Sequence, residues 1–284
     1  MSQFIVSSTE RFLSAVGSAR AVELGAFVLP PRVVRALEAA AERGARVEVV
    51  LPDAAGPPGS ADTVGRNQLD AAVANELRHH GIGVRFAGEP GAPFHLKAAV
   101  VDGRSFLTDR NWTARGEVVL SSRDPGAAAA LGAVLDGQPS PPRVANAALR
   151  KDAALALEAR LIASSRGDRI DVESESFGDC AVARSLTDRA RAGTSVRLLA
   201  NRHLLASDAN GREHAALDRL AQAGVEIRVG AATDKLAVAG SGGWVGSANA
   251  TRGFAATTDW GARTRAHGVV SVIRDRFDTN WQAA

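Results

Sequence analysis

Residues 95–113, HLKAAVVDGRSFLTDRNWT, decide the fold of this chain, because residues 233–251, TDKLAVAGSGGWVGSANAT, align with them without a gap. A second match lies upstream, between ELRHHGIGVRF at 76–86 and RLAQAGVEIRV at 219–229. Similarity that recurs in the same order indicates an internal duplication. The longer alignment pairs two lysines and two asparagines: Lys97 with Lys235, and Asn111 with Asn249.

Predicted strands and helices alternate in both halves, which predicts an α/β fold with mainly parallel sheets. A segment rich in proline and glycine, DGQPSPPR at 136–143, interrupts this pattern near the middle of the chain and reads as a linker. We therefore expect a first repeat over 1–135 and a second over 144–284. The strands are expected at 21–29, 47–51, 84–86, 169–173, 196–200 and 225–229, and the helices at 31–43, 67–80, 145–163, 181–192 and 213–223.

The composition is that of an ordinary globular protein, with 284 residues, 45% hydrophobic content and a formal net charge of +3. No apolar run approaches the roughly 20 residues that a membrane helix needs. The amino-terminal segment does not resemble a secretory signal, so we expect a cytoplasmic protein. Cys180 is the only cysteine, which excludes an intrachain disulfide and a cysteine-built zinc site.

The motif H-x-K-x4-D occurs once, at His95, Lys97 and Asp102. On a strand, His95 and Lys97 would point to the same face, whereas Asp102 would point to the other and could support neighbouring backbone. Lysine is rare in this chain, being present only at Lys97, Lys151 and Lys235. Two of the three lysines thus occupy matching positions of the duplication, which indicates a phosphate site.

These residues resemble the signature of the phospholipase D superfamily, in which H-x-K-x4-D is followed by G-S-x-N. The resemblance covers most of the chain as two repeats and implies two β-α-β sandwiches related by a pseudo-twofold axis, with both lysine strands facing one cleft. It also implies attack of one histidine on phosphorus, protonation of the leaving group by another, and no metal or cofactor. A neutral imidazole is a competent nucleophile near pH 7, and ammonium and amide groups can hold phosphate oxygens.

Each repeat departs from this signature in its own way. The second keeps Lys235 and the Gly246-Ser247-x-Asn249 element, but it has Thr233 in place of histidine and Gly240 in place of aspartate. The first has residues 108–111, TDRN, in place of G-S-x-N. We therefore expect His95 as the single nucleophile and a phosphate-binding set of Lys97, Asn111, Lys235, Ser247 and Asn249.

The expected site lacks an obvious general acid, whose loss typically costs about 10²- to 10⁴-fold in rate. The segment RAHGVVSVI at 265–273 resembles the expected strand RGEVVLSS of the first repeat, so we expect a strand here too, with His267 opposite Glu117. By resemblance to the family, Glu117 would hydrogen-bond His95 and fix its tautomer. We hypothesise that His267 is the displaced acid; as the alternative, it only fills a position on a strand.

Other features have ordinary explanations beside the functional ones. Trp112 and Trp244 could stack on a base or fill the core, and the glycine-rich segment 240–243 predicts a hairpin turn. His79 and His80 fall at an expected helix end, where the helix dipole accounts for them, and His203 and His214 have no partners at metal-ligand spacing. The leading function is a phosphodiesterase with a nucleic acid slightly favoured over a phospholipid, acting as a monomer or a homodimer. The alternative is a degenerate, non-catalytic protein that binds a phosphorylated ligand or acts as a scaffold.

Overall fold

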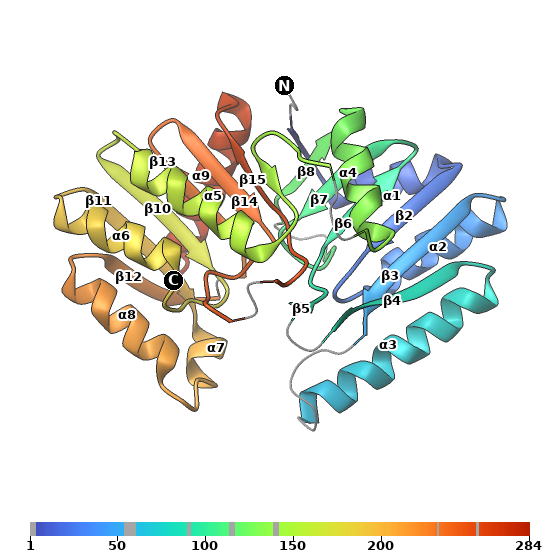
Figure 1. Cartoon of the computed structure of the whole chain (residues 1–284), viewed down its shortest axis with the longest axis horizontal. Coiled ribbons are helices and arrows are strands. Elements are labelled where there is room, and N and C mark those ends of the chain that lie inside the picture. Colours follow the sequence, from blue (N-terminus) through green and yellow to red (C-terminus); the bar gives the residue numbers. More distant parts are fainter. Residues whose placement is uncertain are drawn as a thin grey trace. The chain divides into compact units, whose positions relative to one another are not determined.

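The computed structural model describes residues 4–53, 61–89, 92–113, 117–138, 142–231, 233–253 and 256–284, without the side chains of 61–69. These residues form two compact units, each with one sheet flanked by helices (Figure 1). Unit 1 comprises Met1–Ala145 together with Ala256–Trp260, and unit 2 comprises Asn146–Ala255 together with Gly261–Ala284. The short segment 256–260 therefore packs with the first unit, although it follows most of the second in sequence.

Unit 1 contains an eight-stranded sheet with the strand order β1-β8-β7-β6-β2-β3-β4-β5. Its strands β2, β3 and β4 are parallel, and β6, β7 and β8 form an antiparallel meander beside them. The elements are β1 (Ile5–Ser7), α1 (Thr9–Ser18), β2 (Ala21–Gly25), α2 (Pro31–Glu42), β3 (Arg46–Pro52), α3 (Ala61–His79), β4 (Gly83–Glu89), β5 (Ala92–Pro93), β6 (Ala98–Val101), β7 (Arg104–Thr108), β8 (Val119–Ser122) and α4 (Pro125–Leu135).

Unit 2 repeats this arrangement in a seven-stranded sheet with the order β12-β11-β10-β13-β14-β15-β9. Strands β10, β11 and β12 are parallel, and β13, β14 and β15 are antiparallel. The elements are β9 (Ala147–Ala148), α5 (Lys151–Ser164), β10 (Arg169–Ser174), α6 (Ala181–Arg191), β11 (Ser195–Asn201), α7 (Arg202–Ala206), α8 (Arg212–Gln222), β12 (Glu226–Gly230), β13 (Leu236–Ala239), β14 (Gly242–Gly246), β15 (Gly261–Thr264) and α9 (His267–Gln282).

The predicted β-α units are confirmed, and local sequence explains their boundaries. Helix α2 begins at Pro31, where the missing N–H of proline costs no helical hydrogen bond. The chain leaves this helix through Gly44, whose φ of 89° lies in the left-handed region that a side chain disfavours. Strand β3 then starts at Arg46, parallel to β2. The predicted turn at 240–243 is also confirmed, since Ala239 pairs with Gly242 across the β13–β14 hairpin.

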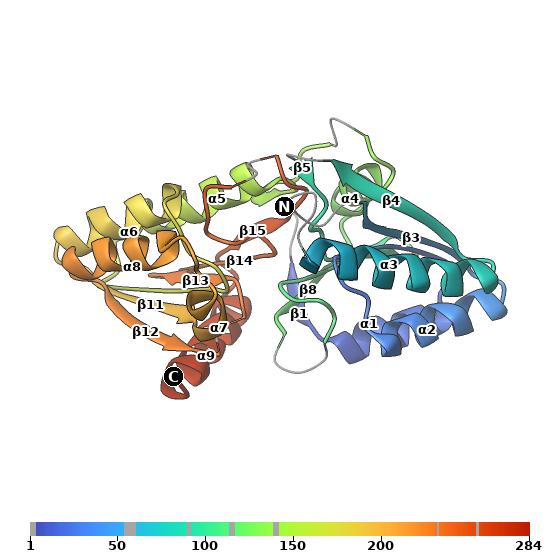
Figure 2. The same ribbon diagram turned by 90° about the horizontal axis from the view of Figure 1, so that it is seen from below.

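Helices cover both faces of each sheet. In unit 2, α5, α6 and α8 lie on one face and α9 on the other (Figure 2). Alternate residues of β10 show the two environments: Ile170 and Val172 belong to the apolar core with α5 and α6, whereas Asp171 is buried in a polar network with Asp278 of α9. Among the described residues, none of the helices combines the length and the apolar character that crossing a bilayer requires.

The prediction of a strand at 265–273 is wrong, because α9 begins at His267. The buried residues of this segment recur at helical spacing: Val269, Val270, Ile273, Phe277 and Trp281. That period extends over four turns and outweighs the short local match to the first repeat.

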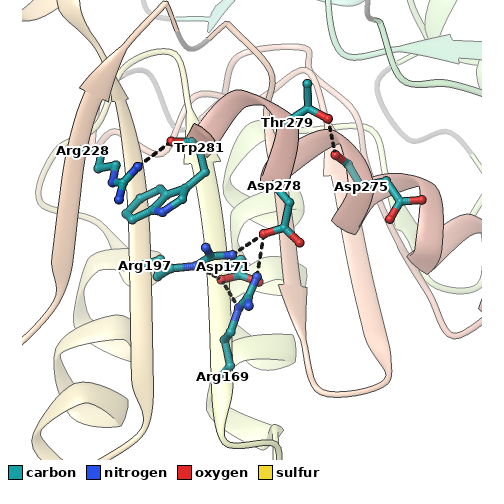
Figure 3. Close-up of polar contacts among 8 residues, drawn as sticks. All are labelled: Arg169, Asp171, Arg197, Arg228, Asp275, Asp278, Thr279 and Trp281. Atoms are coloured by element: carbon teal, nitrogen blue, oxygen red, sulfur yellow. Dashed lines mark hydrogen bonds and ion pairs between the residues drawn. The ribbon is translucent and has the colours of Figure 1, made fainter. Parts of the chain in front are cut away.

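Helix α9 is held to its sheet by charge as well as by apolar packing (Figure 3). Asp278 accepts hydrogen bonds from Arg169 at 2.7 Å and from Arg197 at 2.6 Å, and both arginines also bind Asp171. Burial raises the pKa of the Asp171 carboxyl, and the two arginines compensate its charge. This network fixes the polar face of the unit 2 sheet.

Candidate active site

His95 and Lys97 lie in the irregular segment just before β6, and not within the strand. Residues 256–260 run alongside this segment. The backbone N–H of His95 donates to the carbonyl of Thr258 at 2.9 Å, and the N–H of Thr258 donates to Pro93 at the same distance. These two hydrogen bonds fix the register between segments that are far apart in sequence.

This register places Asp259 against the motif histidine. Oδ1 of Asp259 lies 2.8 Å from Nδ1 of His95, and Nζ of Lys97 lies 2.8 Å from Nε2 of the same ring. Because a lysine ammonium can only donate, Nε2 is the acceptor and Nδ1 carries the proton that Asp259 accepts. The imidazole is thus held in the neutral tautomer whose lone pair is on Nε2.

The three side chains differ in their access to solvent. Asp259 and Lys97 are buried, with only 2% of the Asp259 side chain exposed, whereas 17% of the His95 side chain is exposed. The ring of Phe27 packs edge-on against His95 with a centroid separation of 4.5 Å, and its centroid lies 5.1 Å from Nζ of Lys97. An apolar wall therefore shields one side of the pair and strengthens its electrostatic interactions.

Asp102 supports the backbone, as its position in the motif predicted. Its carboxylate accepts the N–H of Ala21 at 2.9 Å and the N–H of Arg20 at 3.1 Å, which ties the end of β6 to the start of β2. Its φ of 46° is in the left-handed region, where aspartate is tolerated better than most residues. Asp102 therefore supports the backbone where β6 meets β2.

The T-D-R-N element follows β7 in unit 1. Asp109 is fully buried and its Oδ1 accepts the N–H of Val118 at 3.0 Å, so it closes the loop that leads into β8. Asn111 is partly exposed, and within the described residues its buried Oδ1 has no hydrogen-bond partner. Trp112 is buried and stacks on Phe12 with a centroid separation of 4.1 Å, so it belongs to the core. Trp244 is likewise a core residue that donates to the carbonyl of Ala154.

The prediction that Glu117 orients His95 is wrong, because Asp259 has this role. Glu117 accepts hydrogen bonds from Thr9 at 2.8 Å, from Thr108 at 3.2 Å and from the Thr113 hydroxyl at 2.7 Å. These bonds tie α1 and the end of β7 to the loop before β8.

The sheet register shows how the two carboxylates are related. In unit 1, the N–H of Thr108 donates to the carbonyl of Lys97, and Thr108 pairs with Val119 at the start of β8. In unit 2, the N–H of Gly246 donates to the carbonyl of Lys235, and Gly246 pairs with Gly261 at the start of β15. Glu117 precedes Val119 by two residues and Asp259 precedes Gly261 by two, so the two carboxylates occupy equivalent positions. Glu117 follows Asn111 by six residues and Asp259 follows Asn249 by ten, so the second repeat has a loop four residues longer. A gapped alignment would have found Asp259.

The hypothesis of His267 as the displaced acid gains no support from its place in unit 2, where it is the first residue of α9. The carbonyl of Lys235 accepts the N–H of Gly246, which pairs with Gly261 at the start of β15. His267 follows the other end of β15, beyond Thr264. Lys235 is level with Gly261, the first residue of β15, whereas His267 follows Thr264, the last residue. At about 3.4 Å per residue, the strand places these two levels roughly 10 Å apart.

Lys235 occupies the second motif position but has its own counter-ion. Nζ donates to Oε2 of Glu175 at 2.7 Å and to the carbonyl of Thr233 at 3.2 Å. Sequence reasoning missed Glu175, because no motif marks the loop after β10. Ser247 is fully buried and Asn249 is partly exposed, with a buried Oδ1 like that of Asn111.

Asp234 points away from Lys235 into a buried acidic pair. It accepts from Nε of Arg276 at 2.6 Å, and Nδ2 of Asn280 lies 2.8 Å from both Asp234 and Glu173. Burial and then the charge of Asp234 raise the pKa of Glu173 to about 7. Both carboxyl groups are buried against α9, which supplies Arg276 and Asn280.

The third lysine, Lys151, is a structural residue. It is buried at the start of α5, and Nζ donates to the Thr251 hydroxyl at 2.7 Å and to the Gly253 carbonyl at 2.8 Å. The loop that follows Asn249 is anchored by these bonds. No cluster of three metal-ligating side chains occurs in the part of the chain that the structure describes.

A duplicated unit of one mixed sheet between helices, carrying one H-x-K-x4-D motif, defines a phospholipase D-like fold. A family model described as "Cardiolipin synthase, PLD-like domain" matches residues 14–132. No significant match was found among curated proteins. The family match therefore covers most of the first repeat, and the second repeat is related to it by the duplication and by the fold.

Solved structures share the fold over nearly the whole chain. Polyphosphate kinase from Porphyromonas gingivalis matches with a TM-score of 0.67 and 15% identity over 99% of this chain and 50% of its own, so this chain spans about half of that protein. Phosphatidylserine synthase from Haemophilus influenzae Rd KW20 matches with a TM-score of 0.69 and 9% identity over 99% and 86%. Yeast tyrosyl-DNA phosphodiesterase matches with a TM-score of 0.52 and 10% identity over 93% and 89%.

Proposed function

We propose that this protein is a metal-independent phosphodiesterase in which Nε2 of His95 attacks phosphorus. The observation that carries the proposal is the Asp259–His95–Lys97 chain of contacts, with 2.8 Å at each step. Asp259 holds the proton of the ring on Nδ1 and stabilises the positive charge that the ring gains when Nε2 forms a bond. Lys97 places an ammonium group beside Nε2, where the charged oxygens of a phosphodiester would be held.

The reaction has two balanced steps. In the first, the bond between Nε2 and phosphorus forms, the bond between phosphorus and the leaving oxygen breaks, and that oxygen receives a proton from solvent. In the second, water attacks phosphorus and gives a proton to solvent, the phosphorus–nitrogen bond breaks, and the electron pair returns to Nε2. An alcohol in place of water turns hydrolysis into transfer.

The proposed phosphate ligands of unit 1 are Lys97 and Asn111, and those of unit 2 are Lys235, Ser247 and Asn249. The register supports the equivalence of the two sets. The carbonyl of Lys97 accepts the N–H of Thr108, three residues before Asn111, and the carbonyl of Lys235 accepts the N–H of Gly246, three residues before Asn249. Asparagine amides and lysine ammonium groups are donors that suit non-bridging oxygens.

For the substrate, we favour a nucleic acid over a phospholipid head group. The fold is shared with a tyrosyl-DNA phosphodiesterase and with a phosphatidylserine synthase, so both classes fit the superfamily. An arginine-rich chain with a net charge of +3 suits an anionic polymer.

A second candidate is a non-catalytic protein that binds a phosphorylated ligand or serves as a scaffold. The specific observation in its favour is in unit 2, where Thr233 replaces histidine and Glu175 already neutralises Lys235 at 2.7 Å. In this case the His95 ring would bind phosphate without being phosphorylated.

Cleavage of bis(p-nitrophenyl) phosphate in excess EDTA tests the proposal, because p-nitrophenolate leaves without a proton. We compare wild type with His95→Asn, in which the amide can still donate to Asp259, and with His79→Asn as a control at an exposed position. The proposal expects activity in wild type and in the control, and loss in His95→Asn. Absence of cleavage by wild type, or unchanged cleavage by His95→Asn, would favour the binding protein.

A further inference from the structure

Two arginines of unit 1 stand side by side at the end of the sheet where β6 turns into β7. The register pairs Val101 with Arg104 across this turn, and Ser105 with Ser122 across β7 and β8. Arg123 follows β8 directly, so it stands opposite Arg104 and on the same face of the sheet. Like charges opposite each other on neighbouring strands are destabilising.

Helix α1 brings a third guanidinium group to the same face. Phe12 of α1 packs edge-on against Phe106, with ring centroids 5.6 Å apart, and Phe106 lies two residues after Arg104 on β7. Arg11 precedes Phe12 in the helix. Burial, and then the charges of Arg123 and Arg11, lower the pKa of the Arg104 guanidinium group. These three residues form one positively charged group, the arginine cluster.

The fold explains only one member of the arginine cluster. Nη2 of Arg104 donates to the Ser121 hydroxyl at 2.8 Å, and the guanidinium carbon lies 5.0 Å from the ring centroid of Phe106. These contacts hold Arg104 against the sheet. Its buried Nε has no hydrogen-bond partner among the described residues.

The carboxylates next to the cluster in sequence are engaged elsewhere. Glu10 precedes Arg11 but binds Arg32 at 3.2 Å. Asp124 follows Arg123 but caps the start of α4 with a hydrogen bond of 2.9 Å. None of the ion pairs within the described residues includes a member of the cluster. Since Arg11 and Arg123 are exposed, an anion from solution can supply the counter-charge.

The cluster lies away from the proposed catalytic residues of the same unit. Lys97 directly precedes β6, whereas Arg104 pairs with the last residue of that strand. At about 3.4 Å per residue, the strand separates these two levels by roughly 14 Å. The arginines are therefore outside the His95–Lys97 site.

We infer that the arginine cluster is a second anion site, which binds the phosphodiester backbone of a nucleic acid at a distance from the reacting group. The choice of a nucleic acid rests on the proposed function, whereas the anion site rests on the cluster itself. Guanidinium groups bind phosphate oxygens through paired, charge-assisted hydrogen bonds, and neighbouring groups can hold successive phosphates. A bilayer surface fits less well, because interfacial binding also requires exposed apolar area and α1 buries Phe12 and Val16.

The test measures binding in a His95→Asn background, so that the ligand is not cleaved. The probe is a fluorescently labelled single-stranded DNA of about 20 nucleotides, followed by anisotropy at salt concentrations from about 50 to 200 mM. Arg11→Gln/Arg123→Gln removes two exposed charges of the cluster. Arg35→Gln/Arg85→Gln, at two exposed arginines elsewhere in unit 1, is the matched control. Circular dichroism checks that each variant is folded.

Two further measurements separate the possible outcomes. Vesicles of phosphatidylcholine with about 30% phosphatidylglycerol test whether the cluster binds lipid instead of DNA. Cleavage of bis(p-nitrophenyl) phosphate by the variants with His95 intact tests whether the cluster affects the reaction, and it should be unchanged because this ester is too small to reach both places.

A plot of the logarithm of the DNA association constant against that of the salt concentration should fall for every variant. Arg11→Gln/Arg123→Gln should reduce its slope by about 0.7 for each lost phosphate contact, roughly 1.4 in all, with weaker binding at low salt. Equal slopes and affinities for this variant and the control would overturn the inference, as would loss of vesicle binding without loss of DNA binding. If the cluster variant loses DNA binding while wild type cleaves no bis(p-nitrophenyl) phosphate, the inference stands and the proposed function fails.

Discussion

The substitution Glu158→Gln should make the protein more stable at alkaline pH. Glu158 lies on α5 with 2% of its surface exposed, and burial raises the pKa of its carboxyl group from the ordinary 4.5 to about 8. The folded chain therefore holds this proton more tightly than the unfolded chain. The stability contributed by the protonated group is complete below pH 4.5 and is lost as the pH rises toward 8.

The magnitude follows from the size of the pKa increase. Each unit corresponds to about 1.4 kcal/mol, so ionisation of Glu158 can cost up to about 5 kcal/mol above pH 8. Glutamine has nearly the same shape and cannot ionise. The stability difference between Glu158→Gln and wild type should therefore grow by as much as about 1.4 kcal/mol per pH unit between pH 5 and pH 8.

Urea unfolding followed by circular dichroism at pH 5, 6, 7, 8 and 9 measures this difference, and amide hydrogen exchange of α5 reports on unit 2 specifically. The exposed Glu226→Gln serves as the control, with no pH-dependent gain. A constant difference between Glu158→Gln and wild type across this pH range would refute the reasoning.

Two further predictions concern the site of unit 1. Asp259→Asn leaves Nδ1 of His95 without a carboxylate, so kcat on bis(p-nitrophenyl) phosphate should fall about 10²- to 10⁴-fold with little change in KM; unchanged kcat would exclude an orienting role. Asp102→Ala removes the acceptor of the Arg20 and Ala21 N–H groups and puts alanine at a φ of 46°, so stability in urea should fall by about 1–3 kcal/mol. Asp102→Asn, which tolerates this φ, should lose less; equal losses would show that the backbone conformation is unimportant.

Much of the fold could be predicted because its signals are local. Helix ends marked by proline and glycine, and the repeated helix-glycine-strand pattern, identified the parallel part of both sheets. The failure at 265–273 came from a match of a few apolar residues to the first repeat. The spacing of Val269, Ile273, Phe277 and Trp281 over a longer window indicates a helix and was the better signal.

The sequence by itself determined the duplication, the unique H-x-K-x4-D motif and the equivalence of Lys97 and Lys235, because these depend only on residue identity and spacing. Only the tertiary structure decided which carboxylates serve the two motif positions. Asp259 reaches His95 through backbone pairing between irregular segments 164 residues apart, and Glu175 reaches Lys235 across 60 residues. Contacts of this kind are set by strand register and loop length, and no local pattern in the chain encodes them.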